Sequence, residues 1–158
     1  MNNPTSLAET LLGLDGFQIL EVHETADELI INIDTKSTIV CCPACGVRAQ
    51  AKDRMRVDMS DLPCFGRPAR LVWMKRRWRC SDSDCDAKTW TETTDHVPPR
   101  GVLTNRCGIE ATRQVGELAR PISSIKHQFT WRNRIGYHRF DVRFPTRSGR
   151  FGTGYVSC

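Results

Sequence analysis

The sequence contains no apolar run that approaches the length of a membrane span, and its longest strand-like run covers only residues 28–33. It also lacks a secretory signal peptide, because no basic region followed by an apolar region occurs near Met1. We therefore expect a cytoplasmic protein with no membrane partner. In that compartment cysteines stay reduced, so the cysteines of this chain are expected to bind metal rather than form disulfides.

Basic residues outnumber acidic ones after the first quarter of the chain. Residues 1–40 carry a net charge of −6, whereas residues 41–100 carry +4 and residues 101–158 carry +7. A surface with this excess of bases attracts polyanions, of which nucleic acid is the simplest candidate. The alternative interpretation is a solvated surface on which the asymmetry has no functional meaning.

Four cysteines form two close pairs. Two residues lie between Cys42 and Cys45, four lie between Cys80 and Cys85, and 34 lie between the two pairs. This is the spacing of a zinc ribbon, in which four thiolates complete a tetrahedral shell. The sequence therefore predicts one structural Zn²⁺ and no open catalytic position. Buried free cysteines, a redox dithiol and iron in a rubredoxin-like site are the alternatives.

The other four cysteines are not expected to bind zinc. Cys41 competes with Cys42, but Cys42 gives the regular two-residue gap before Cys45. Cys64 falls in a predicted turn, Cys107 on the apolar face of a predicted helix, and Cys158 at the end of the chain.

Hydrophobic periodicity predicts an α+β fold. The expected elements are a helix over residues 5–14, strands over 17–23, 28–35, 54–59 and 70–79, a turn over 61–66, and helices over 103–118 and near 122–129. They predict an N-terminal helix and acidic β-hairpin in residues 1–40, a small β-rich zinc ribbon in 41–97, a partial helix-turn-helix in 102–130, and a disordered tail in 131–158.

Eight basic residues are candidates for contact with DNA. They are Arg54, Arg56, Lys75, Arg76, Arg77, Arg79, Arg120 and Lys126. We expect the alternating face of Lys75, Arg77 and Arg79 to contact the DNA backbone and Trp78 to lie in the core; the alternative is a solvated strand face. Phosphate contacts position a protein without reading sequence, so reading would need a recognition helix that begins near residue 131.

Several motifs occur in an order that resembles the N-terminal zinc ribbon of ISL-three family insertion-sequence transposases. They are the first cysteine pair with Pro43 and Gly46, the Asp61-Leu-Pro segment, Leu71 and the run 76–80, Cys85, the segment 90–92, and a helix-turn-helix-like stretch at 117–125. The resemblance covers roughly residues 14–131. It implies a module that binds double-stranded DNA at the terminal inverted repeats of the element, and self-association with an intact transposase. A bacterial protein of this kind is expected to associate with the nucleoid when it is bound to DNA.

The sequence departs from this family at its C-terminal end. The family has a catalytic domain in which two Asp and one Glu hold two divalent metals, but only 29 residues follow Phe129. Residues 131–158 contain six Arg, no Lys and one acid, as out-of-frame translation would produce. We therefore expect a non-enzymatic, frameshifted DNA-binding fragment. A zinc-ribbon module that binds RNA or a protein of the transcription machinery is the alternative function.

Overall fold

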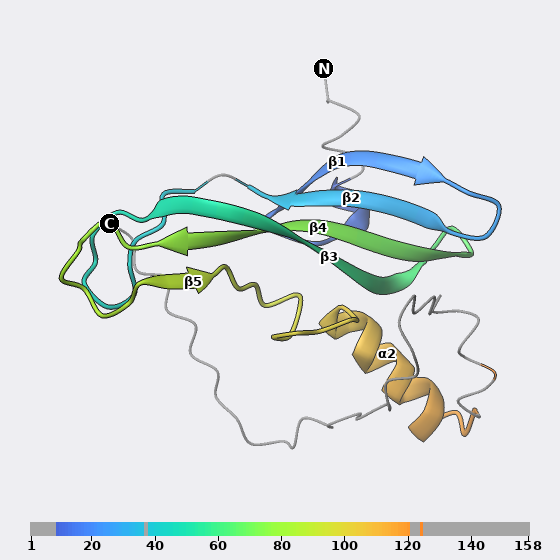
Figure 1. Cartoon of the computed structure of the whole chain (residues 1–158). Coiled ribbons are helices and arrows are strands. Elements are labelled where there is room, and N and C mark those ends of the chain that lie inside the picture. The colour runs from blue at the N-terminus through green and yellow to red at the C-terminus, as the bar shows by residue number, and fades with distance from the viewer. Residues whose placement is uncertain (1–8, 37, 121–123, 125–158) are drawn as a thin grey trace, which may run out of the picture.

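The computed structural model describes residues 9–36, 38–120 and 124 (Figure 1). Within them the elements are β1 (Phe17–Glu24), β2 (Leu29–Thr35), β3 (Gln50–Cys64), β4 (Arg67–Arg79), β5 (Thr89–Thr91) and α2 (Asn105–Gly116). Residues 9–12 are also helical. The described part of the chain is therefore rich in β-structure, as predicted. The second helix of the expected helix-turn-helix and the tail at 131–158 fall almost entirely outside the described residues.

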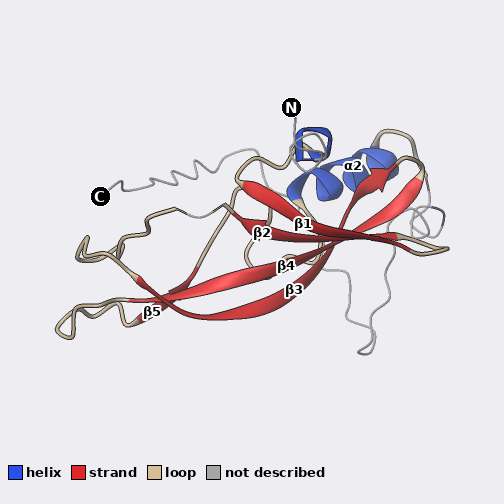
Figure 2. Ribbon diagram, turned by 90° about the horizontal axis from the view of Figure 1, so that it is seen from above, coloured by secondary structure: helices blue, strands red, loops and turns tan. Residues whose placement is uncertain are grey.

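The strands form one mixed sheet in the order β1-β2-β4-β3, and β5 also pairs with β4 (Figures 1 and 2). The β1–β2 and β3–β4 pairs are antiparallel, whereas β2 runs parallel to β4 with Ile31 opposite Leu71. The acidic hairpin and the ribbon strands thus share a single sheet. Among the described residues, no helix has the length and hydropathy that a membrane crossing requires.

The turn between β3 and β4 is much shorter than predicted. The sequence predicts a turn over residues 61–66, but β3 continues to Cys64 and only Phe65 and Gly66 connect the strands. Both residues have positive φ, 53° and 77°, as the two-residue turn of a twisted hairpin requires. A register irregularity between Asp61 and Cys64 accommodates Pro63, which cannot donate to the ladder. Both strands are longer than the predicted ranges 54–59 and 70–79, because β3 has 15 residues and β4 has 13.

The apolar core lies on one face of the sheet. Its largest buried side chain is Trp73, which packs edge-on against Phe17 with ring centroids 5.2 Å apart. Leu12 and Leu14 from the N-terminal segment pack against this cluster, whereas the neighbouring Leu11 is exposed. Burial of the remaining members, Ile31, Ile33, Met59, Ala69, Leu71 and Val97, completes the core.

The helix α2 begins at Asn105 because the side chain of Thr104 accepts a hydrogen bond from the backbone N–H of Cys107. The sequence predicts an apolar face on this helix, but only the N-terminal part of that face is buried. Cys107 packs with Leu62 and Leu103, but Val115 and Leu118 are exposed. The helix lies beside the turn end of the sheet, away from the loops that carry the cysteine quartet (Figures 1 and 2).

A buried carboxylate attaches α2 to the sheet. Asp61 is fully buried in β3, and its Oδ1 accepts hydrogen bonds from Thr104 Oγ1 at 2.6 Å and from Arg106 Nε at 2.8 Å. Arg106 also pairs with Asp61 Oδ2 and donates to the carbonyl of Leu12. We call Asp61, Thr104 and Arg106 the Asp61 junction. It joins β3, α2 and the N-terminal segment, so α2 is docked on the sheet.

Candidate metal centre and nucleic-acid surface

The β3–β4 hairpin brings the two cysteine pairs together. Cys42 and Cys45 precede β3, whereas Cys80 and Cys85 follow β4. Because the strands are antiparallel and Gln50 lies opposite Arg79, the start of β3 and the end of β4 meet at the same end of the hairpin. The cysteines therefore gather at the end opposite the Phe65–Gly66 turn (Figure 1).

The four sulfur atoms have the arrangement of a zinc site. The Sγ atoms of Cys42 and Cys85 are 3.7 Å apart, those of Cys45 and Cys80 are 3.5 Å apart, and all four lie within 4.8 Å of one another. A tetrahedron with Zn–S bonds of about 2.3 Å has edges of about 3.8 Å, which these distances match. Because four thiolates fill the coordination shell, the centre is structural and holds one Zn²⁺.

Backbone hydrogen bonds shape each cysteine loop. In the first loop the N–H of Gly46 donates to the carbonyl of Cys42 at 2.9 Å, and Gly46 has a φ of 73°, which glycine adopts without strain. In the second loop the N–H of Asp82 points at Cys80 Sγ at 3.4 Å. Such N–H groups stabilise charge on sulfur and orient the ligand.

The electrostatics of the cluster favour a bound cation. The backbone N–H of Cys45 lowers the pKa of Cys42 to about 7. At Cys85 the backbone N–H of Ala87 acts in the same direction, but burial and the neighbouring thiols raise its pKa to about 12. Four adjacent thiols cannot all ionise beside one another without a compensating charge, and a metal ion supplies that charge.

Residues 39–85 match the family of the zinc-finger of transposase IS204/IS1001/IS1096/IS1165. The chain carries a transposase-type zinc ribbon. The matched segment includes all four cluster cysteines together with β3 and β4. No curated protein and no solved structure matches the chain.

The remaining described cysteines lie outside the metal centre of the transposase-type ribbon. Cys41 is not in the cluster, and its backbone pairs with Arg48 in an isolated bridge. Cys41 is disulfide-bonded, so the expectation that the cysteines form no disulfides is wrong for this residue. Cys64 is half-buried near the hairpin turn. Cys107 is fully buried on α2, as the helical pattern predicts, and Cys158 lies outside the described residues.

The predicted DNA-contact residues of the ribbon have different environments. Arg76 is buried and donates to Asp34 Oδ2 at 3.0 Å and to the carbonyl of Thr35. Arg54, directly opposite it in the ladder, donates to the same oxygen at 2.8 Å and is half exposed. Two like charges opposite each other would repel, so Asp34 compensates the pair. Arg76 thus has an internal role that sequence reasoning did not assign.

The other basic residues are more accessible. Lys75 Nζ lies 4.8 Å from the centroid of the Trp73 ring, Arg79 donates to the neutral Gln50, and Arg77 pairs loosely with Asp53 at 3.4 Å. Two further members of the predicted set have short-range partners, since Arg56 pairs with Asp58 and Arg120 donates to Gln114. Lys126 lies outside the described residues.

Sequence reasoning missed the three carboxylates that organise this region. Asp34 holds two arginines, Asp61 holds Arg106, and Glu92 accepts from the backbone N–H of Arg76 and from Thr35 Oγ1. Asp34 continues the polar face of the alternating strand β2, which is a weak signal for a paired carboxylate. Its partners lie on other strands, so only the three-dimensional pairing identifies them.

Peptide-resolved alkylation should distinguish the metal ligands from the other thiols. In zinc-loaded protein at neutral pH we expect the four cluster cysteines to react with iodoacetamide only after chelation. Cys107 should resist even then, because burial raises its pKa to about 12. Cys64, half-buried outside the cluster, is the control that chelation should not change. Equal labelling of the four cysteines before and after chelation would refute a bound metal.

Proposed function

We propose that this chain binds double-stranded DNA through its zinc ribbon, in the manner of the DNA-binding end of an insertion-sequence transposase. The observation that carries the proposal is the match of residues 39–85 to a transposase zinc finger, over a segment in which four cysteines converge. The role is binding rather than catalysis. The target is the terminal inverted repeat of an element, and the setting is the cytoplasm.

The charge of the ribbon strands supports this proposal. Lys75 and Arg79 have no acidic partner within 4 Å among the residues the structure describes, so no ion pair there offsets either charge. Arg77 shares its charge with an exposed Asp53, and such exposed pairs are weak in water. Together with the basic excess of the sequence after residue 40, these side chains favour a phosphate backbone as the partner.

Zinc has a structural role in this function. The metal joins the chain before β3 to the chain after β4 and so fixes the end of the hairpin that carries Arg77 and Arg79. Without it these side chains would lose their common orientation. We therefore expect DNA binding to require zinc although no ligand of the metal touches the DNA.

Fluorescence anisotropy tests the proposal with three labelled probes: a duplex with an inverted repeat from an element that encodes such a ribbon, a scrambled duplex and an RNA duplex. We expect zinc-loaded protein to bind the repeat most tightly, and we expect chelation to weaken binding to both DNA duplexes at least tenfold. The affinity should fall as salt rises, because phosphate contacts release counterions. Zinc readdition is the control for reversible loss.

The other outcomes identify other functions. Equal binding to all three probes would refute recognition of the repeat and leave a general polyanion binder. Preference for RNA would favour the RNA-binding alternative. Absence of binding to every probe would refute the nucleic-acid proposal and favour a protein partner.

A further inference from the structure

The register of the β3–β4 ladder divides the ribbon cations between two faces. Lys75, Arg77 and Arg79 alternate along β4 on the same face as Trp73. Arg54, Arg56 and Arg76 lie on the opposite face, since Arg54 is opposite Arg76 and Arg56 is opposite Met74. Because Arg76 is buried against Asp34, the accessible members of the set are Lys75, Arg77 and Arg79 on one face and Arg54 and Arg56 on the other. The sequence suggested a single contact face at Lys75, Arg77 and Arg79.

The strand that joins these two faces lies at the edge of the sheet. β3 is the last strand in the order, and its neighbour on the inner side is β4. On the outer side, among the described residues, Leu103 bridges to Ser60, and no strand is paired along residues 50–58. The side chains of residues 50–56 are all exposed. This part of β3 therefore projects as an accessible rim with bases on both sides.

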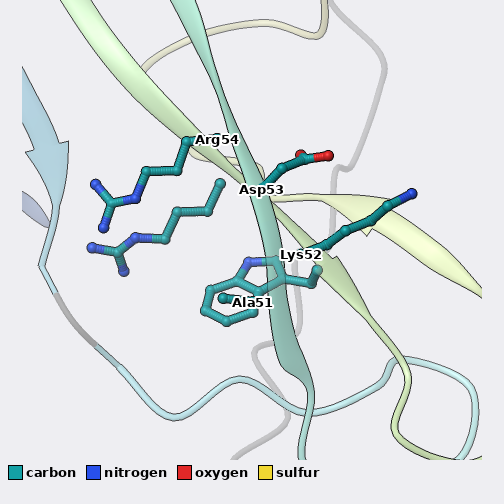
Figure 3. Close-up of a pocket in the computed structure, with 6 residues that line it drawn as sticks. Ala51, Lys52, Asp53 and Arg54 are labelled. Atoms are coloured by element: carbon teal, nitrogen blue, oxygen red, sulfur yellow. The ribbon is translucent and has the colours of Figure 1, made fainter.

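The face with Arg54 has a hollow beside this rim. The hollow has a volume of about 380 Å³, and Ala51, Lys52, Asp53, Arg54, Arg76 and Trp78 line it. Figure 3 shows Arg54 on the opposite side of the β3 ribbon from Lys52 and Asp53. The Asp34 side chain is 5% exposed whereas that of Arg54 is 49% exposed, so the positive end of this ion pair points outward. The hollow thus presents a guanidinium to an incoming anion.

We propose that the β3 edge enters the major groove of duplex DNA, with the cations of its two faces on opposite phosphate strands. The inference rests on the proposed DNA binding and specifies its geometry. A B-form major groove is about 12 Å wide and admits a β-ribbon, and both of its walls are lined by phosphates. A flat contact through the face of Lys75, Arg77 and Arg79 would leave Arg54 and Arg56 without a phosphate, whereas insertion of the edge uses both faces.

The salt dependence of duplex binding tests this geometry. The affinity falls linearly with salt on a log–log plot, and each lost phosphate contact makes the slope less negative by about 1. We expect Arg54→Gln and Arg79→Gln each to make the slope less negative by about 1, and the double variant by about 2. Arg67→Gln is the matched control. Arg67 lies on β4, as Arg79 does, but near the turn, and it pairs with Glu24. It should leave the slope unchanged.

Two further measurements make the test decisive. Arg54→Lys keeps the charge and should retain the slope, and zinc stoichiometry with circular dichroism confirms that each variant is folded. A-form RNA duplex should bind weakly, because its major groove is deep and narrow. A slope that becomes less negative with Arg79→Gln but not with Arg54→Gln, in folded protein, would overturn the two-faced contact. Absence of duplex binding by the unmodified protein would refute the proposed function itself.

Discussion

Replacement of Cys80 by serine is expected to remove zinc and to unfold the cysteine-bearing end of the ribbon. Serine leaves three thiolates around the metal, and a structural Zn²⁺ contributes roughly 10–16 kcal/mol to the folding of zinc-finger peptides. Few apolar side chains replace that contribution here, because the main core cluster ends at Trp73 along β4 and only Trp78 is a buried apolar side chain of that strand beyond it. Zinc content by mass spectrometry of metals and hydrogen exchange over residues 40–50 and 79–91 measure the two effects.

Cys64→Ser is the matched control for this change. Cys64 is a half-buried cysteine of β3 outside the cluster, so its replacement should leave the zinc content at one ion per chain. An unchanged zinc content and unchanged exchange in Cys80→Ser would contradict the metal centre described here.

Replacement of Asp61 by alanine is expected to destabilise the protein by about 3–5 kcal/mol, as when one partner of a buried ion pair is removed. The carboxylate is fully buried and receives hydrogen bonds from Thr104 and Arg106. Its loss leaves the Arg106 guanidinium without its anion and removes the attachment of α2 to β3. Urea unfolding followed by tryptophan fluorescence, at a fixed excess of zinc, measures the change.

The neighbouring pair of Asp58 and Arg56 supplies the control for the Asp61 change. Both side chains of this pair are largely exposed, and their Nε–Oδ1 distance is 3.1 Å. Exposed pairs of this kind contribute at most about 1 kcal/mol, so Asp58→Ala should cost much less than Asp61→Ala. Equal costs for the two variants would show that the Asp61 junction does not stabilise the fold.

Local patterns predicted the parts of this protein that depend on local physics. The alternation of Leu29, Ile31 and Ile33 identified β2, because side chains in a strand point alternately to two faces. The spacing of the cysteines identified the metal cluster, since two close pairs joined by a hairpin can bring four sulfurs together. The burial of Cys107 on α2 was also predicted, because its position follows the helical repeat of apolar residues.

The features that sequence reasoning missed depend on contacts between distant segments. β2 pairs in parallel with β4, although the first cysteine loop and β3 lie between them in the sequence. No local signal specifies this pairing. That pairing brings Asp34 to Arg76, which turns an expected surface base into a buried one. Asp61-Leu-Pro resembles a turn by composition, but burial of Asp61 against Arg106 extends the strand through it.

The apolar core and the zinc centre lie at opposite ends of the β3–β4 hairpin. Trp73 is the last residue of β4 in the extended core cluster, and Cys80 follows seven residues later, about 23 Å along an extended strand. Metal loss therefore acts first on the end that carries Arg77 and Arg79, where the apolar core does not reach. The metal content of a preparation is for this reason the necessary measure of quality for this protein.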